Sequence, residues 1–387
     1  MNDFTFYNPT QLVFGKTSTD QLADKIKQFT NGKKILITYG GGSIKRTGLY
    51  DRVMKLLAEF EVFELAGIEP NPRVETVRKG VQIVKENHID FIVAIGGGSV
   101  IDGTKLISAA SKLDNDPWDI VTKKAEVKDA VPFGVILTLA ATGSEMNAGS
   151  VITNWETNEK LGWGSPFVFP KFSLLNPELT YTLPYNQTVN GIVDSMSHLI
   201  EQYFNEASNT EIGDAMISGV MKAIMKQAPI VKANPENYEV RETLMLGATV
   251  ALNGFMRLGY NGDWATHNLE HAVSAVHDIP HGEGLAILFP EWMRYVSQYK
   301  PERFVKFAQD VFDVDHTLPE AEQIQYGIDQ LQSFWTGIGA PSKLSHYDIK
   351  EEELATFADK TFFNGDTFGN FYPLNREAVM AIYKAAL

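Results

Sequence analysis

The chain has 387 residues, of which 44% are hydrophobic and 21% charged, values typical of a globular protein rather than a disordered one. It contains no apolar run of about 18 residues and no N-terminal targeting signal, so we expect a soluble, cytoplasmic protein with no membrane partner. The absence of cysteine excludes disulfides, thiolate metal ligands and cysteine nucleophiles. A net charge of -14 argues against a nucleic-acid partner, because phosphate contacts need a basic face.

The first half of the chain alternates short apolar strands with helices, a pattern that indicates a parallel sheet covered by helices on both faces. We expect an edge strand or hairpin within Phe4–Phe14 and a helix over Ser18–Phe29. The expected strands are Ile35–Tyr39, Val62–Leu65, Phe91–Ile95, Phe133–Thr138 and Phe172–Leu175, and helices are expected around Leu49–Leu57, Val74–Glu86 and Val100–Ser111. These elements predict a doubly wound, Rossmann-like α/β domain.

After Leu183-Pro184 the pattern becomes helical. The expected helices are Val189–Tyr203, Glu211–Gln227, Tyr238–Leu252, Leu285–Ser297, Pro301–Phe312, Ile324–Ile338 and Arg376–Ala386. Because 387 residues exceed the usual size of one hydrophobic core, we predict two domains. Residues 1–184 form the α/β domain and residues 185–387 an all-helical domain, with the active cleft expected between them.

Histidines and one aspartate are spaced as metal ligands are. Asp194 and His198 are four residues apart, and so are His267 and His271, so each pair shares one face of a helix. His277 and His281 follow closely, and His281 opens a Gly-rich stretch through Gly284. Imidazole nitrogen and carboxylate oxygen are the donors that a borderline divalent ion takes. The pattern favours a metal site over ordinary core or surface histidines.

Two glycine-rich turns connect a strand to a helix. Glycine lets backbone N–H groups approach an anion at a helix N-terminus, so Gly97, Gly98 and Ser99 suit a pyrophosphate, with Asp102 in the first helical turn. A ligand-free βα turn is the alternative. The usual G-x-G-x-x-G fingerprint is absent, since Ile101 holds the position of its third glycine. The small, hydroxylated segment Thr138–Asn147 could close over a phosphate or nicotinamide, or be a surface turn.

The other glycine turn, Gly40–Ser43, carries no acidic residue. Enzymes selective for NAD commonly place a carboxylate at the adenosine ribose, whereas here Lys45 and Arg46 follow the loop. Small donors and nearby cations suit a 2′-phosphate. We therefore predict NADP(H) rather than NAD(H), against the alternative that Lys45 and Arg46 are a solvated helix start.

Taken together, these residues resemble the iron-containing (group III) alcohol dehydrogenases, and within them the NADPH-dependent aldehyde reductase and butanol dehydrogenase branch. The matching segments span most of the chain in order: Gly40–Ser43, Glu69–Pro72, Gly96–Asp102, Thr142–Glu145, Asp194 with His198, and His267, His271 and His281 with Gly282. The resemblance implies an N-terminal nucleotide-binding domain and a C-terminal metal-binding domain, the architecture shared with dehydroquinate synthase, in a homodimer.

The resemblance also implies roles for individual residues. One divalent ion, Fe²⁺ or Zn²⁺, would be held by Asp194, His198, His267 and His281. His271 would lie near the nicotinamide and substrate and carry a proton, and Asp102 is the second expected catalytic residue. The expected nucleotide-binding residues are Gly40, Gly41, Ser43, Asn71, Gly97, Gly98, Ser99, Asp102, Thr138, Thr142, Asn147, Lys160 (after the strand-like Val151–Thr153), Leu179, Thr182 and Leu183.

The implied activity is hydride transfer between NADP(H) and small aldehydes or primary alcohols of the butanal and butanol type, with the metal as Lewis acid. Two alternatives remain open. A lyase of the dehydroquinate synthase type would use a nicotinamide transiently, but its acidic phosphate substrate needs clustered basic residues, which the stretch from Asp194 to His281 lacks. A catalytically idle metal-binding protein is the other. His277 lies outside the four-ligand pattern, and a structural role is preferred for it.

Overall fold

The computed structural model describes residues 1–362 and 365–387, and these form two compact units. The first, here called the sheet unit, comprises Tyr7–Leu183 and Pro235–Thr249. The second, called the helical unit, comprises Met1–Phe6, Pro184–Asn234 and the described part of Val250–Leu387. Each unit has its own buried core.

The sheet unit is built on a six-stranded, fully parallel sheet, as the continuous apolar strands predict. Its spatial order is β1 (Gln11–Phe14), β8 (Phe172–Leu175), β5 (Phe133–Leu137), β4 (Phe91–Gly96), β2 (Lys34–Tyr39) and β3 (Glu61–Leu65). The segment expected to be extended from Phe4 supplies only β1, at one edge of the sheet.

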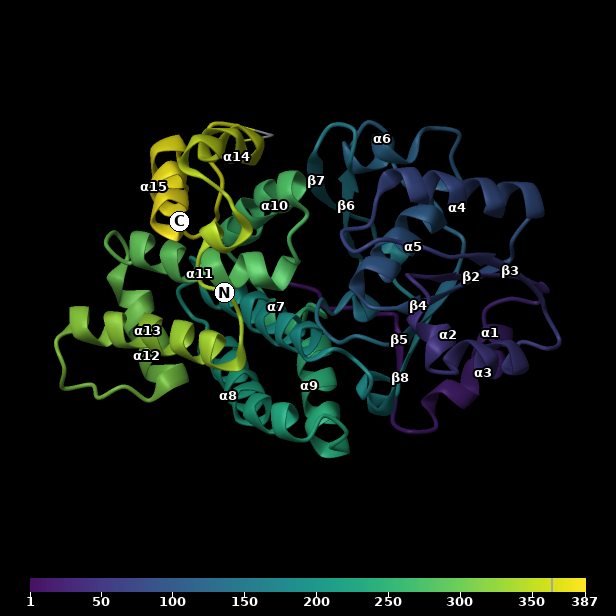
Figure 1. Cartoon of the computed structure of the whole chain (residues 1–387), viewed down its shortest axis with the longest axis horizontal. Helices are drawn as coiled ribbons and strands as arrows, with labels where there is room; N and C mark the ends of the chain where they lie inside the picture. Colours follow the sequence, from purple (N-terminus) through teal and green to yellow (C-terminus); the bar gives the residue numbers. More distant parts are fainter. Residues whose placement is uncertain (363–364) are drawn as a thin grey trace. The chain divides into compact units, whose positions relative to one another are not determined.

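Helices cover both faces of this sheet (Figure 1). The helices on one face are α1 (Leu22–Lys27), α2 (Ser43–Arg46) and α3 (Leu49–Leu56), and those on the other are α4 (Val74–Asn87), α5 (Gly98–Ala110) and α6 (Pro117–Val121). Successive strand residues alternate between the two cores: Ile35 and Ile37 pack with α1 and α3, whereas Leu36 packs with α4 and α5. The α/β prediction is confirmed.

The strand order reverses direction at β2 and β4, which is where a doubly wound sheet binds ligands. β3 lies on the outer side of β2, while β4 lies on its inner side, in register through Tyr39 and Ile95. The turns that follow these two strands, Gly40–Ser43 and Gly97–Ser99, therefore open side by side at the carboxyl edge of the sheet. β5 comes next in the order, so Thr138 follows a third adjacent strand.

A two-stranded antiparallel hairpin, β6 (Gly149–Asn154) and β7 (Glu159–Gly164), stands apart from the main sheet. The sequence indicated a strand only at Val151–Thr153. β7 was missed because Glu159, Lys160 and two glycines weaken its strand pattern, and its pairing with β6 decides its conformation.

Helix α9 (Tyr238–Ala251) lies in the helical half of the sequence, yet its residues through Thr249 belong to the sheet unit. Met245 packs in the apolar core beside α4 and α5, and Thr249 Oγ1 donates a hydrogen bond to the buried Glu145 carboxylate at 2.5 Å. Such long-range contacts leave no local mark in the sequence, so the units are discontinuous along the chain.

The helical unit contains eight α-helices in its described residues. They are α7 (Tyr185–Tyr203), α8 (Glu211–Ala233), α10 (Ala265–His277), α11 (His281–Val296), α12 (Pro301–Phe312), α13 (Glu320–Ile338), α14 (Leu354–Thr361) and α15 (Arg376–Ala386). α11 packs against α7, α10, α13 and α15, which makes it the central helix. Within the described residues of the whole chain, no helix combines the length and apolarity needed to cross a bilayer.

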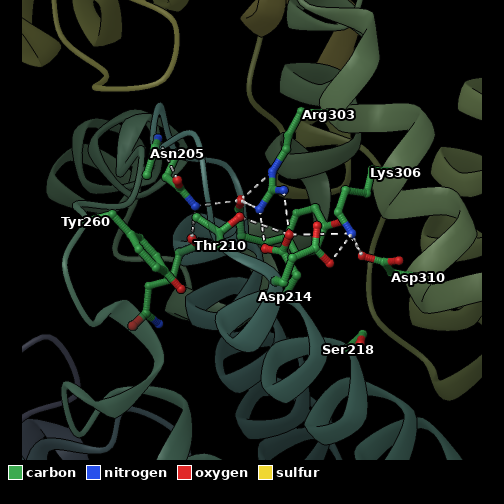
Figure 2. Close-up of polar contacts among 12 residues, drawn as sticks. Asn205, Thr210, Asp214, Ser218, Tyr260, Arg303, Lys306 and Asp310 are labelled. Atoms are coloured by element: carbon green, nitrogen blue, oxygen red, sulfur yellow. Dashed lines mark hydrogen bonds and ion pairs between the residues drawn. The ribbon is translucent and has the colours of Figure 1, made fainter. Parts of the chain in front are cut away.

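The C-terminal end of α7 is fixed by a buried polar network (Figure 2). Arg303 of α12 donates from Nε to the Tyr203 carbonyl at 2.9 Å and forms a two-pronged ion pair with Asp214 of α8, whose oxygens lie 2.8 and 2.5 Å away. Asn205 Nδ2 donates to the carbonyls of Gln202 and Tyr203. Helix ends leave carbonyl groups without partners, and these donors satisfy them, so α7 is held rigidly at that end.

Candidate metal centre and nucleotide loops

Asp194 and His198 lie one turn apart on α7, in the part of the helix whose apolar stripe packs into the helical unit. Both side chains are buried, and His198 Nε2 lies 3.7 Å from Asp194 Oδ1. His198 Nδ1 is buried without a hydrogen-bond partner among the described residues. Two donors at this separation can bind one ion, as the four-residue spacing indicates.

His267 and His281 join this pair from two further helices. His267 lies in the first turn of α10 and His281 is the first residue of α11. Asp194, His267 and His281 each offer a ligand atom, and these atoms all lie within 4.8 Å of one another. His281 Nε2 is 3.6 Å from Asp194 Oδ1, and the rings of His198 and His267 have their centroids 4.8 Å apart. The structure thus brings Asp194, His267 and His281 within reach of one ion and places His198 beside Asp194 and His267.

Two buried glutamates are hydrogen-bonded to the Nδ1 atoms of His267 and His281. Neither was predicted as a site residue from the sequence. Glu201 Oε1 lies 2.8 Å from His267 Nδ1, and Glu270 is hydrogen-bonded to His281 Nδ1. Both carboxylates are fully buried. A carboxylate on Nδ1 fixes the ring orientation and tautomer and leaves Nε2 as the donor to an ion. The spacing could have found Glu201, which lies three residues after His198 on the same helical face.

The electrostatics of the cluster suit a cation. Burial, together with the neighbouring imidazoles, holds the pKa of His198 well below its ordinary value, so the ring is neutral, as a metal ligand must be. Burial raises the pKa of Glu201 to about 8, opposed by hydrogen bonds from backbone N–H groups, chiefly that of His267. Burial and the Glu201 charge likewise raise the pKa of Asp263 to about 8. A divalent ion would favour the ionised forms, because it supplies the missing positive charge.

The glycines after His281 serve helix packing. The apolar pattern predicts this helix from Leu285, but α11 begins at His281. A Cβ on Gly282 would lie 2.4 Å from the Asn190 backbone of α7, and one on Gly284 would lie 2.7 Å from Glu270 Cγ. Only glycine allows the first turn of α11 to approach α7 and α10 this closely, which brings His281 to Asp194.

In the sheet unit, the N-terminus of α5 has the form of an anion site. Gly97 is the N-cap and has no side chain to cap the first-turn N–H groups. A Cβ on Gly97 would lie 2.9 Å from Leu139 Cβ, and one on Gly98 would lie 2.4 Å from Thr142 Cγ2. These glycines are therefore required where the turn meets the Leu139–Thr142 segment, and the first-turn amides of this 13-residue helix are suited to receive a pyrophosphate.

A fully buried lysine fastens the segment after β5 to α5. Lys105 Nζ donates to Ser144 Oγ at 2.7 Å, to Asn147 Oδ1 at 2.9 Å and to the Gly149 carbonyl at 2.7 Å. Ser144 Oγ in turn donates to Asp102 Oδ1 at 2.5 Å. Burial lowers the pKa of Lys105 to about 8, which leaves it charged at neutral pH. We call Asp102, Lys105, Ser144 and Asn147 the loop clamp.

Comparison with known proteins assigns this arrangement to a family. Residues 9–177 match the model described as iron-containing alcohol dehydrogenase, and residues 188–387 match that of the Fe-containing alcohol dehydrogenase family, C-terminal. The chain belongs to the iron-containing alcohol dehydrogenase family. The family and oxidoreductase class predicted from the sequence are confirmed, and nothing in these matches supports the dehydroquinate synthase alternative.

Named relatives extend over the whole chain. A probable NADH-dependent butanol dehydrogenase 1 of Bacillus subtilis (strain 168) is 56% identical, with 100% of both chains covered. The NADPH-dependent aldehyde reductase YqhD of Escherichia coli (strain K12) is 38% identical, again with 100% of both chains covered. The crystal structure of an NADH-dependent butanol dehydrogenase A from Thermotoga maritima has a TM-score of 0.96 at 38% identity, covering 100% of this chain and 99% of that one.

Among the other predicted site residues of this alcohol dehydrogenase, Asp102 and Asn147 are held in the loop clamp, whereas the roles of the rest stay predictions. Both carboxylate oxygens of Asp102 accept hydrogen bonds from the protein, from Ser144 Oγ and from the Val151 N–H, and Asn147 is held by Lys105. This geometry favours positioning of the loop over direct catalysis for Asp102. For the remaining residues the roles stay predictions: Asn71 in a left-handed turn, Lys160 in β7, and Leu179, Thr182 and Leu183 in and after the 3-10 turn that follows β8.

The two remaining histidines of α10 differ in their surroundings. His271 is half-buried one turn after His267, and its ring centroid lies 5.5 Å from that of His281. This position beside the candidate metal ligands suits a residue that carries a proton. His277 Nε2 lies 2.8 Å from Glu353 Oε1, and its ring meets Phe357 of α14 edge-on. That contact ties α10 to the α14 region, which favours a structural role for His277.

The glutamate behind His267 provides a direct test of the metal site. Replacing Glu201 with glutamine keeps the size of the side chain but puts an amide where His267 Nδ1 meets Oε1. We expect metal affinity to fall about 10- to 100-fold, the usual cost of losing such a partner. Metal titration against a competing chelator would measure it. Unchanged metal affinity would show that Glu201 does not orient a ligand.

Proposed function

We propose that this alcohol dehydrogenase reduces small, unbranched aldehydes such as butanal to primary alcohols with a nicotinamide nucleotide and one divalent ion. The observation that carries the proposal is the gathering of Asp194, His198, His267 and His281 from three helices, with carboxylates behind two of the imidazoles. Three histidines and one aspartate suit Fe²⁺ or Zn²⁺. A bound ion would supply Lewis acidity toward the oxygen of the aldehyde or alcohol.

The chain's own residues would do the rest by holding and orienting. The N-terminus of α5, with Gly97, Gly98 and Ser99, would bind the pyrophosphate, and the turn at Gly40–Ser43 would receive the adenosine ribose. The Thr138–Asn147 segment, held at Ser144 and Asn147 by the loop clamp, would border the nicotinamide end. His271 would exchange the substrate proton with solvent, directly or through water.

For the nucleotide, we propose NADPH as the better ligand, with NADH also used. The support is the neutral loop Gly40–Ser43 followed by Lys45 and Arg46. The relatives include proteins named for either nucleotide, so neither is excluded by kinship. The homodimer implied by the resemblance also stays a proposal; β1 is an edge strand with a partly exposed Phe14, which another chain could cover.

The test is the initial rate of butanal reduction by purified, metal-analysed protein, with NADPH and NADH at equal concentration. We expect oxidation of either nucleotide to depend on butanal, to disappear with a chelator and to return with one divalent ion. Metal-loaded protein that oxidises neither nucleotide with butanal would contradict the proposed substrate. Turnover that survives complete metal removal would contradict the proposed role of the four ligands.

A further inference from the structure

A carboxylate on β3 faces the end of β2. The hydroxyl of Tyr39, the last residue of β2, donates to Glu64 Oε2 at 2.6 Å, and the hydroxyl of Tyr50 on α3 donates to Glu64 Oε1 at 2.5 Å. Both oxygens of Glu64 therefore have a phenol donor. Burial opposes the ionisation of Glu64, but the two hydrogen bonds and a nearby lysine hold its pKa below the ordinary value. The group is a carboxylate at neutral pH.

That lysine is Lys45, one of the two cations on which the NADP(H) prediction rests. Its Nζ lies 3.8 Å from Glu64 Oε2, 4.5 Å from the centre of the Tyr50 ring and 5.4 Å from that of Tyr39. Lys45 is thus not simply a solvated helix residue. Its ammonium group is shared between a carboxylate and two aromatic faces, contacts that attract a cation.

This cluster adjoins the turn proposed to receive the adenosine ribose. Tyr39 directly precedes Gly40, and Lys45 is two residues past Ser43. The turn is tied to the segment after β3, because the Gly67 N–H donates to the Gly40 carbonyl at 3.1 Å and the Ile68 N–H to the Tyr39 carbonyl at 3.2 Å. A change of charge at Glu64 therefore alters the electrostatic environment of this turn.

We propose that Glu64 sets the discrimination between NADPH and NADH by holding Lys45 and cancelling its charge. The inference deepens the proposed function and rests on it, since it assumes that the Gly40–Ser43 turn receives the ribose. A 2′-phosphate is strongly anionic, so it gains from a cation that is free to contact it, whereas a 2′-hydroxyl is nearly indifferent to that charge. Glu64 thereby keeps both nucleotides usable. It is a positioning residue that acts through Lys45.

The test compares binding and turnover in the Glu64→Gln variant. Glutamine retains an oxygen that can accept from a tyrosine hydroxyl but removes the negative charge. We expect the ratio of NADPH to NADH affinity to rise about fivefold, as expected for one partly exposed charge contact. Calorimetry with adenosine 2′,5′-bisphosphate and 5′-AMP isolates the adenosine end and does not depend on metal or turnover. The ratio of kcat/KM values for the two nucleotides should shift by the same factor.

Two further variants test whether the effect is specific to Glu64 and depends on Lys45. Glu61→Gln removes the same charge from the exposed start of β3 and should leave the ratio unchanged. Lys45→Met should lower the ratio, and adding Glu64→Gln to it should change the ratio less than about twofold, because coupled residues are not additive. The proposal is overturned if Glu64→Gln leaves the ratio unmoved, or if its effect is undiminished without Lys45.

Gly41→Asp separates this inference from the proposed nucleotide site. A Cβ on Gly41 meets nothing within 4 Å, so the variant should fold normally and place a carboxylate on the turn. We expect this variant to weaken the binding of NADPH more than the binding of NADH. If Gly41→Asp changes neither the NADPH affinity nor the NADH affinity, the turn does not receive the ribose and the proposed nucleotide placement is wrong. If Gly41→Asp acts but Glu64→Gln does not, only the inference about Glu64 fails.

Discussion

Alanine at His267 is expected to abolish stoichiometric metal binding and to reduce butanal turnover by more than about 100-fold, the upper end of what losing an outer-shell partner costs. The imidazole is the element that links the buried Glu201 carboxylate to the proposed ion. Its removal takes away one ligand of four and leaves Glu201 without its ring partner. Nucleotide affinity should stay within about twofold, because the glycine turns belong to the sheet unit and His267 to the helical unit.

His277→Ala is the matched control for this variant. It removes a histidine from the same helix, but one that contacts Glu353 and lies outside the ligand cluster. Three properties should be measured on both proteins: metal content by mass spectrometry, NADPH binding by fluorescence, and the rate of butanal turnover. Metal should persist in His277→Ala and vanish in His267→Ala. Activity retained by a metal-free His267→Ala protein would refute the proposed chemistry.

The second large effect is expected from Lys105→Met. Methionine fills similar space but donates no hydrogen bond, so Ser144, Asn147 and the Gly149 carbonyl lose their common donor. Asp102 also loses its favourable charge interaction with Lys105. Removing one member of a buried charged network costs about 3–5 kcal/mol, and we expect a loss of stability of that size. Nucleotide affinity should fall as well, since the clamp holds the segment after β5 against α5.

Urea unfolding measures the loss as a shift of the midpoint at constant slope. The matched control is Lys112→Met, just beyond the end of α5, where Nζ makes an exposed ion pair with Asp129 at 3.5 Å. Exposed pairs contribute at most about 1 kcal/mol, so this control should unfold almost as the parent does. A Lys105→Met protein as stable as the control would show that the clamp does not carry the stability assigned to it.

Much of the fold could be predicted from local patterns. Continuous apolar strands ending in glycine turns, as at Ile35–Gly42 and Phe91–Gly98, indicated the parallel sheet because strand burial and turn chemistry are properties of neighbouring residues. Asp194 and His198 could be paired because four residues make about one helical turn. The family resemblance joined them to His267 and His281. Neither spacing nor composition would have done so, because those two residues lie on other helices.

The tertiary structure decided what depends on contacts between distant segments. It placed Glu201 and Glu270 behind the ligand rings, and it assigned α9 largely to the sheet unit. It also changed the interpretation of Lys45, because Glu64 lies nineteen residues further along the chain but only 3.8 Å away. The sequence by itself determined most of the strands and long helices, the candidate ligands and the family. Which charges cancel and which side chains orient others depends on packing, which brings residues together without regard to their spacing in the chain.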